Sequence, residues 1–445
     1  MHPGLKQIQI LKYYLEAKLS SRRFQERNSL ELWQEQQIQQ LLVKIRADSS
    51  FYRQLWQGHL LTNWRTFPII NKEIMMANFD TLNTVGISQH QAFDLAFRSE
   101  KSRDFSPTID DFTIGLSSGT SGHRGLFLVS QTEQQRWAGQ VLAKVLPGPL
   151  WHKHRIAFFL RANSNLYTTV GSHHIQFQFF DLFGSVDSHL YQLEVFQPTL
   201  LVAPPSMLRL LGEAIQSGQL SIQPQKVVSV AEVLEPFERA WLENVYGQPI
   251  HQVYQCTEGF LGFSCHFGTL HLNEDLIVIQ KVYLDSERNV FTPIITDFSR
   301  PTQPIIRYQL NDVLTERQNP CPCGSVFTAI ESIDGRCDDL LYFPGTHLTK
   351  WIPVFPDFIR RIILQIDEPI EDYQVRQADA RTLTIGILGT LSCEAEHQIR
   401  KDINHLCSEQ HCRTPEIYFQ PYEQVPSGTK KRRIQRIFQL PQEVA

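Results

Sequence analysis

The sequence lacks the features that mark several large classes of protein. No apolar run approaches the ~20 residues that a membrane-spanning helix needs. The N-terminal segment has neither the uninterrupted apolar core nor the small-residue cleavage site of a signal peptide. No internal repeat or long low-complexity linker is present, and the net charge of -4 gives no general reason to expect nucleic acid or an anionic membrane as a partner. We therefore expect a cytoplasmic protein that binds neither nucleic acid nor membranes.

The composition is that of a globular protein with more than one domain. The chain has 445 residues, of which 42% are hydrophobic and 20% charged. This length allows two or three domains with sizeable cores. The eight cysteines are unevenly distributed, because four of them lie between residues 256 and 323. A disulfide framework is not expected in a reducing compartment, so this clustering favours a metal site.

The pattern of apolar segments predicts an α/β fold in the N-terminal part. Compact apolar runs at 154–160, 199–202 and 226–230 are typical of buried strands, and a helical pattern at 206–216 separates the last two. Strand–helix–strand order implies a parallel sheet. From about residue 250, short strands separated by turns predict a mixed, β-rich subdomain.

The composition changes after Asp334, and the remaining segments predict a separate, smaller domain. Strands and helices are expected there in the order β-α-β-β-α-β, which fits a ferredoxin-like α+β domain. We therefore predict an α/β protein with a large N-terminal domain, residues 1–334, and a small mobile C-terminal domain, residues 335–445.

The segment 117–125, SSGTSGHRG, is the most informative stretch of the chain. Its glycines allow a ligand to approach the backbone closely. Its hydroxyl groups and its arginine are suited to phosphate oxygens. The Walker spacing G-x-x-x-x-G-K-[ST] is absent. A polar surface turn is the competing interpretation, because serine–glycine clusters usually form turns.

Four later segments suit nucleotide chemistry, although each alone has an ordinary structural explanation. YQCTEG, at 254–259, follows a strand and brings a hydroxyl and a carboxylate that suit a phosphate and Mg²⁺. Asp312, in RYQLND, suits ribose hydroxyls, and an Asp that caps a turn is the alternative. GRCDD, at 335–339, suits a hinge. The basic loop GTKKRR, at 428–433, suits a phosphate or a developing oxyanion.

A second signal is a set of three cysteines and one histidine: Cys265, His271, Cys321 and Cys323. Three thiolates and one imidazole are a usual tetrahedral ligand set for structural zinc. The Cys-Pro-Cys-Gly turn at 321–324 is able to aim two sulfurs at one point. Cys256 and His266 are alternative ligands, and the competing interpretation is a set of buried thiols and turn cysteines. We predict about one zinc ion per chain.

Together and in order, these segments resemble the motifs of the adenylate-forming enzymes, which include acyl-CoA synthetases, peptide-synthetase adenylation domains and luciferases. The matching motifs are SSGTSG, YQCTEG, RYQLND, GRCDD and the late GTKKRR, over roughly residues 50–435. Phe51-Tyr52-Arg53, FPIINKEIM and Ala231-Glu232 are similar to the short phenylacetate–CoA-ligase-like branch. Within it, the chain most resembles adenylate-forming proteins related to the synthetase that nucleotidylates the deazaflavin coenzyme of methanogens.

The resemblance implies a set of nucleotide contacts. Tyr254 would flank the adenine, with Ala231-Glu232 on its other side, and Asp312 would bind the ribose hydroxyls. The residues that embrace the β- and γ-phosphates would be Ser117, Ser118, Gly119, Thr120, Ser121 and Gly122.

The same resemblance implies catalytic residues and a hinge. Thr257 would contact phosphate, and Glu258 would hold Mg²⁺. Arg336 would lie near the ribose, and Asp338 would be the hinge. Lys430 would bridge the carboxylate and the α-phosphate during adenylation. Cysteines and a histidine like those above bind zinc in some phenylacetate–CoA-ligase-like proteins.

The phosphate loop departs from the family pattern, and the position of the late lysine is ambiguous. The phosphate loop often ends in a lysine, whereas this chain has His123-Arg124-Gly125. Arg124 is the expected substitute, although its planar fork is not a point charge. Lys430 and Lys431 adjoin, and we favour Lys430 because Arg433 follows three positions later, as in the family pattern.

The segment 161–184 is expected to run past the acyl site if the family layout applies. It is rich in phenylalanine, and an aromatic-lined pocket suits an aryl or other small carboxylate. Tyr167 and His173 are the candidates for substrate contact. Ordinary core phenylalanines are the competing interpretation.

The resemblance implies an ATP-dependent ligase that converts a carboxylate into an acyl-adenylate and pyrophosphate. A thiol, from CoA or from the phosphopantetheine of an acyl carrier protein, would then attack the adenylate. A nucleotidyltransferase that leaves AMP on its substrate is the second hypothesis. A nucleotide-binding protein without catalysis is the third, because the loop lysine is missing. ATP, Mg²⁺ and a structural Zn²⁺ are the expected cofactors.

Overall fold

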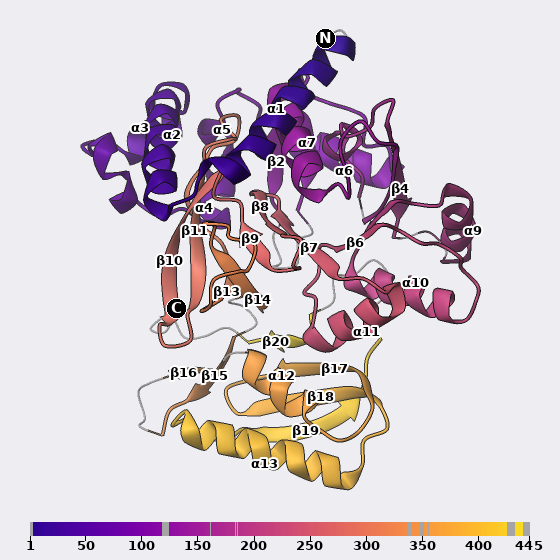
Figure 1. The fold of residues 1–445 in the computed structure, drawn as a ribbon. Coiled ribbons are helices and arrows are strands. Elements are labelled where there is room, and N and C mark those ends of the chain that lie inside the picture. The colour runs from indigo at the N-terminus through magenta and orange to yellow at the C-terminus, as the bar shows by residue number, and fades with distance from the viewer. Residues whose placement is uncertain are drawn as a thin grey trace. The chain divides into compact units, whose positions relative to one another are not determined.

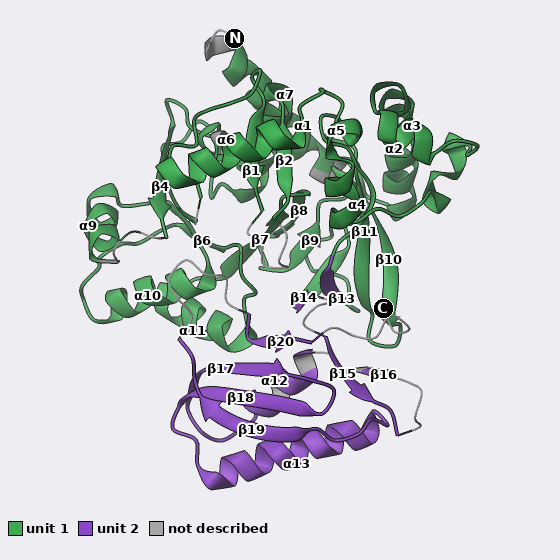
Figure 2. Ribbon diagram, turned by 180° about the vertical axis from the view of Figure 1, so that it is seen from behind, with its two compact units in different colours: residues 1–310, 316–331 green, residues 311–315, 332–445 purple. Residues whose placement is uncertain are grey.

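The computed structural model describes residues 3–117, 124–160, 162–182, 184, 186–336, 340–346, 351–354, 356–424 and 432–438 (Figure 1). The chain forms two compact units (Figure 2). Unit 1 comprises residues 1–310 and 316–331, and unit 2 comprises residues 311–315 and 332–445. None of the helices formed by the described residues is both long and apolar enough to span a membrane.

Five strands form the parallel part of the large sheet. Their order is β4 (Ile175–Asp181), β3 (His154–Leu160), β5 (Leu200–Ala203), β6 (Lys226–Ser229) and β7 (Ile250–Cys256), and each adjacent pair is parallel. Every residue of β5 is buried, as expected for a parallel sheet that is covered on both faces. The parallel sheet predicted from the apolar runs is confirmed.

Three helices pack on one face of this sheet: α9 (Val186–Phe196), α10 (Pro205–Gln216) and α11 (Pro236–Tyr246). Helix α10 begins with Pro205, where a missing N–H costs nothing. Leu208 and Leu211 recur at helical spacing, and both are buried in one cluster with Phe159 and Val227 of the strands. The apolar face of α10 is therefore what attaches this helix to the sheet.

After β7 the chain reverses, and the sheet continues with antiparallel strands. β8 (Gly259–Ser264) pairs with β7 and with β9 (Leu270–Leu272), and β9 pairs with the start of β14 (Ala329–Arg336). β10 (Ile277–Asp285), β11 (Val290–Asp297) and β12 (Ile305–Gln309) form a second antiparallel group. The mixed, β-rich region expected after residue 250 is confirmed.

The N-terminal part of unit 1 is mainly helical, with one hairpin. Its elements are α1 (Pro3–Arg23), α2 (Arg27–Asp48), α3 (Ser50–Leu55), the 3-10 helix η1 (Leu61–Thr66), α4 (Lys72–Ala77), α5 (Phe79–Leu82), α6 (Gln89–Ser102), β1 (Thr113–Leu116), β2 (Leu126–Val129) and α7 (Gln131–Val145). A further short helix, α8 (Asn165–Thr168), follows β3. A buried ion pair anchors these helices, because Lys144 Nζ of α7 lies 2.6 Å from Asp275 Oδ1. Ser20 Oγ of α1 donates to the other oxygen of Asp275 at 2.8 Å.

Unit 2 is an α+β domain, as predicted. Its four-stranded sheet has the order β19 (Glu416–Pro421), β18 (Thr382–Gly389), β17 (Ile370–Gln377) and β20 (Ile434–Arg436), and its helices are α12 (Pro356–Leu364) and α13 (Cys393–Glu409). The unit also includes most of β13 (Asp312–Glu316).

One strand of this domain differs from the predicted order. β15 (Leu341–Pro344), expected as the first strand of the sheet, pairs instead with β16 (Trp351–Val354) in a separate two-stranded sheet. The C-terminal strand β20 pairs in parallel with β17 and forms one edge of the four-stranded sheet. The Gln377 side chain then ties β15 to β17, because it accepts from Tyr342 N at 2.9 Å and donates to Tyr342 O at 2.7 Å.

The packing of α1 on α7 depends on Gly139. A Cβ atom at this position would lie 2.6 Å from Tyr13 Cβ and 2.7 Å from Ile10 O. Alanine normally stabilises a helix by about 1 kcal/mol relative to glycine, but overpacking costs about 1–3 kcal/mol. We therefore expect Gly139→Ala to lower the melting temperature. Gly148→Ala, whose Cβ would have no neighbour closer than 3.5 Å, is the matched control. An unchanged melting temperature for Gly139→Ala would contradict this account of the packing.

Candidate functional site

The turn between β7 and β8 holds the first group of site residues. Glu258 accepts two hydrogen bonds, from Thr257 Oγ1 to its Oε2 and from Tyr308 Oη to its Oε1, both at 2.8 Å. Arg300 Nη1 donates to Thr257 O at 2.6 Å. Tyr308 is a buried residue of β12, so the YQCTEG and RYQLND motifs meet at this carboxylate. Each carboxylate oxygen keeps a lone pair for a cation, which fits the oxygen ligands that Mg²⁺ prefers.

The segment FPIINKEIM reaches the same place through a short parallel bridge. Ile70 N donates to Arg307 O at 3.0 Å, and Gln309 N donates to Ile70 O at 2.8 Å, so Ile70 lies beside Tyr308. Lys72 follows two residues later, at the start of α4. This bridge therefore fixes the start of α4 next to the strand that carries Tyr308.

The two described ends of the predicted phosphate loop lie close together. Ser117 N donates to Gly125 O at 2.8 Å, and Gly125 N donates to Ser117 Oγ at 2.7 Å. These residues continue the β1–β2 hairpin, in which Leu116 pairs with Leu126. Ser118, Gly119, Thr120, Ser121 and Gly122 lie outside the described residues.

Two cations contact Ser117 at this loop, because Arg124 Nε donates to Ser117 O at 3.3 Å and Lys72 also reaches this residue. The Arg124 guanidinium forms two hydrogen bonds with the Glu100 carboxylate, one of them at 2.6 Å. Lys72 Nζ donates to Ser117 Oγ at 3.2 Å, and a Cβ at Gly125 would lie 3.0 Å from Lys72 Cε. Lys72 is 45 residues distant from Ser117 in the chain, so no local pattern indicated this contact.

Ala231 and Glu232 follow β6 at the edge of the sheet where β7 carries Tyr254. Ser229 pairs with Gln252 in the parallel ladder, which sets this alignment. Ala231 has a φ of 67°, a left-handed conformation that non-glycine residues rarely adopt and that often marks a functional loop. Glu232 accepts from Ser206 N at 3.2 Å and from Ser206 Oγ at 3.1 Å. The ends of two neighbouring parallel strands thus contribute to one edge, where α/β sheets usually bind ligands.

An aromatic group adjoins the Tyr254–Glu258 segment. Trp137 Nε1 of α7 donates to Gln255 Oε1 at 3.2 Å, and the Trp137 and Tyr167 rings lie 5.7 Å apart. Phe158 packs on Tyr167 with ring centroids 4.8 Å apart. Burial raises the pKa of Tyr167 to about 12. Trp137 had no sequence signal, because an isolated tryptophan in a helix is indistinguishable from core.

The remaining predicted residues make no described contact with this group or lie outside the described part of the chain. His173 is exposed, and its ring contacts His174 at a centroid distance of 5.2 Å. Asp312 begins β13 in unit 2. Arg336 ends β14, and its side chain is not described. Asp338, Lys430 and Lys431 lie outside the described residues.

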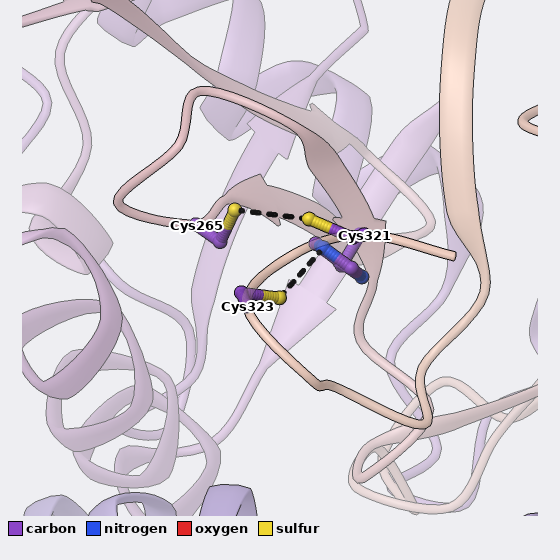
Figure 3. Close-up of side chains that lie close together, drawn as sticks. Cys265, Cys321 and Cys323 are labelled. Atoms are coloured by element: carbon purple, nitrogen blue, oxygen red, sulfur yellow. Dashed lines mark hydrogen bonds between the residues drawn. The ribbon is translucent and has the colours of Figure 1, made fainter. Parts of the chain in front are cut away.

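The three cysteines and the histidine predicted as a metal site come together in unit 1. The ligand atoms of Cys265, His271, Cys321 and Cys323 all lie within 4.8 Å of one another. Figure 3 shows the sulfurs of the three cysteines facing a common space. Neither Cys256 nor His266, the alternative ligands, belongs to this cluster of described residues.

Two tight turns aim the sulfurs. Cys265 follows β8, and Cys265 N donates to Thr269 O at 2.9 Å while Gly268, with a φ of 79°, makes the reversal. On the other side, Gly324 N donates to Cys321 O at 3.1 Å, and Gly324 has a φ of 73°. Glycine is favoured at both positions because an L side chain is strained at positive φ.

The distances in the cluster match tetrahedral zinc. Cys265 Sγ and Cys321 Sγ are 3.7 Å apart, and Cys323 Sγ is 3.4 Å from His271 Nε2. Bonds of about 2.3 Å to sulfur and 2.0–2.1 Å to nitrogen place tetrahedral sulfurs about 3.8 Å apart, and a sulfur and a nitrogen about 3.6 Å apart. His271 Nδ1 lies 3.0 Å from Phe327 O. If Nδ1 carries the proton, Nε2 keeps its lone pair for a metal.

Two thiols of the cluster have shifted pKa values. Burial raises the pKa of Cys321, but hydrogen bonds involving Thr269, Cys323 and His271 outweigh it and lower the pKa to about 6. Burial, with the sulfurs of Cys321 and Cys265 nearby, raises the pKa of Cys323 to about 12. Neighbouring thiolates repel one another, and a cation bound between them would relieve that repulsion.

Comparisons with known proteins agree on one family. No protein-family model matches the chain. It is 22% identical over 209 residues to a phenylacetate-coenzyme A ligase of Thermus thermophilus, over 43% of this chain and 45% of that ligase. It is 22% identical over 355 residues to Protein CapK of Staphylococcus aureus, over 76% of this chain and 74% of CapK. These two likenesses support the resemblance to the adenylate-forming superfamily, and to its phenylacetate–CoA-ligase-like branch, that the motifs indicated. The match spans less than half the length of the Thermus ligase.

Solved structures share this adenylate-forming fold. A 2-hydroxyisobutyryl-CoA ligase in complex with 2-HIB-AMP superposes with a TM-score of 0.66 at 14% identity, over 91% of this chain and 88% of that one. The amide bond synthetase McbA of Marinactinospora thermotolerans superposes with a TM-score of 0.52 at 12% identity, over 72% and 68% of the two chains. The superfamily and the fold expected from the motifs are confirmed, whereas the likeness to the deazaflavin-related synthetase stays a prediction.

Proposed function

We propose that this chain is an ATP-dependent ligase that adenylates a small carboxylate and transfers the acyl group to a thiol. The observation that carries the proposal is the convergence of three distant segments on one carboxylate and one loop. Tyr308 and Thr257 hold Glu258, and the bridge at Ile70 brings in Lys72, which contacts Ser117 at the loop. A triphosphate needs both a cation-binding carboxylate and positive donors, and these segments supply them.

In the first step a carboxylate oxygen attacks the α-phosphorus of ATP, and pyrophosphate leaves. Residues 117–122 and Lys72 would hold the β- and γ-phosphates, and Arg124, which pairs with Glu100 and donates to Ser117 O, would contribute less. Glu258 would hold Mg²⁺, which neutralises charge on the leaving group. Tyr254 and Ala231-Glu232 would enclose the adenine, and Thr257 would contact phosphate.

The remaining roles follow the family pattern. Asp312 would bind the ribose, with Arg336 near it. Lys430 would bridge the carboxylate and the α-phosphate, and rotation at Asp338 would exchange the two half-reactions. Tyr167, with Trp137 beside it, would line the acyl pocket, and His173 would contact the substrate. The thiol would come from CoA or from a carrier-protein phosphopantetheine, and it displaces AMP from the acyl-adenylate.

We further propose that Cys265, His271, Cys321 and Cys323 hold a structural zinc ion. The matching distances and the Nδ1–carbonyl contact of His271 support this assignment. All four positions would be filled by protein ligands, so the ion would stabilise the fold and leave no position for a reacting water.

The function is tested by pyrophosphate release with aryl, fatty and amino acids, each with and without CoA. We expect release that depends on one class of carboxylate, and a thioester when CoA is present. A stable AMP adduct detected by mass would support a nucleotidyltransferase instead. ATP binding without pyrophosphate release across the panel would support a non-catalytic binding protein.

Lys72 and Arg124 provide a matched pair of variants. Removing a donor that stabilises charge in the transition state costs about 10²–10³-fold in rate, so Lys72→Met should reduce carboxylate-dependent ATP–pyrophosphate exchange by that order. Arg124→Met should cost less than about tenfold, because a partly exposed ion pair with Glu100 contributes little. A larger loss for Arg124→Met than for Lys72→Met, at equal melting temperatures, would contradict the assignment of Lys72.

Metal analysis tests the zinc site. We expect about one zinc ion per chain and none after Cys323→Ser, with a lower melting temperature. Mutating a residue that only hydrogen-bonds to a metal ligand reduces metal affinity by about 10- to 100-fold. Loss of a ligand itself should reduce the affinity by more. Cys393→Ser, at an exposed position at the start of α13, is the control and should keep the metal. Full-length folded protein that contains no zinc would refute the site.

A further inference from the structure

Helix α1 has two separate apolar faces. Ile10, Tyr14 and Ala17 are buried, and α1 packs against α7, with Gly139 in close contact. A second set of five aliphatic side chains is exposed, and we call it the α1 stripe: Leu5 (56% exposed), Ile8 (62%), Leu11 (45%), Leu15 (50%) and Leu19 (66%). Single exposed apolar residues are ordinary, but five on one face of one helix form a patch of the kind that binds a partner.

The spacing of the α1 stripe is that of a helix–helix seam. Four of its residues, together with Lys12, follow the 3-4 spacing of a heptad repeat. The a positions are Leu5, Lys12 and Leu19, and the d positions are Ile8 and Leu15. With a rise of 1.5 Å per residue, the seam extends about 21 Å along the helix. A single polar residue at an a position is a known determinant of register in coiled coils. Such a seam suits a second helix better than a membrane, which calls for a broader apolar face.

Charge around the α1 stripe favours an acidic occupant. Lys12, Lys18 and Arg23 are exposed on α1, and Glu16 is the exposed carboxylate, 3.9 Å from Lys12. Three cations and one anion give this exposed set a net charge of +2, whereas the whole chain has -4. Two copies of α1 facing each other would bring like charges together. A helix with acidic flanks would instead complement them.

We propose that the α1 stripe docks an amphipathic helix with acidic flanks from a partner protein. The a and d side chains of that helix would pack between those of α1, and its glutamates or aspartates would pair with Lys12 and Lys18. Helix α1 is already folded and held on α7, so docking does not have to order it. The proposal is independent of the adenylation site.

The test uses the full chain and two synthetic heptad peptides. Both peptides carry Ile at a and Leu at d, one with Glu and the other with Lys at the e and g positions. Fluorescence anisotropy should show binding of the acidic peptide and none of the basic one. Leu15→Asp should weaken binding by at least about tenfold, since it removes a buried leucine contact and adds like charge. Leu32→Asp, at a 69% exposed leucine of α2, is the matched control and should bind normally.

Four results would overturn the proposal. Equal binding of both peptides, or acidic-peptide binding unaffected by Leu15→Asp, would show that the stripe does not recognise an acidic helix. Binding to vesicles of anionic lipid that requires Leu15, without peptide binding, would assign the stripe to a membrane surface. A dimer that Leu15→Asp dissociates in light scattering would assign it to a second copy. Circular dichroism should show that both variants keep their helices.

Discussion

The two-residue turn Thr257-Glu258 is the constraint on which the site depends. At this turn the large sheet changes from parallel to antiparallel, because β7 pairs with β6 on one side and with β8 on the other. Arg300 holds the turn through the Thr257 carbonyl, and Tyr308 holds the Glu258 carboxylate. A carboxylate fixed in this way loses little conformational freedom when it binds a cation. The aromatic residues and the start of α4 gather around it.

Strand β8 connects this turn to the Cys/His cluster. It begins at Gly259, directly after Glu258, and ends at Ser264, directly before Cys265. His271 lies on the next strand, where it pairs with Phe263 of β8 and with Ala329 of β14. A metal held by the four ligands would therefore fix the register of the strands that position the turn. In this arrangement the proposed zinc would support the proposed nucleotide site from the far end of one six-residue strand.

Positive charge adjoins the same cluster. Burial lowers the pKa of Lys226 to about 8, with Lys18 adding to the effect and Cys265 opposing it. Burial, together with Lys226 and Arg239, lowers the pKa of His251 to about 4. Cations near such a cluster stabilise a set of anionic ligands. The environment of the cluster is thus consistent with an anionic three-thiolate centre.

The sequence by itself determined the elements, the superfamily and the ligand set of the metal cluster. Compact apolar runs predict buried parallel strands because only such strands are apolar on both faces, and motif order indicates the superfamily. The tertiary structure decided that Lys72 lies beside Ser117, because the Ile70–Tyr308 bridge places the start of α4 there. It also decided that Trp137 adjoins Tyr167, and that β20 rather than β15 completes the small sheet. These are contacts between residues distant in the chain, and local spacing carries no information about them. Helix α1 is a further example. The heptad spacing of its apolar residues is present in the sequence, but only its packing on α7 decides which of its two apolar faces is exposed.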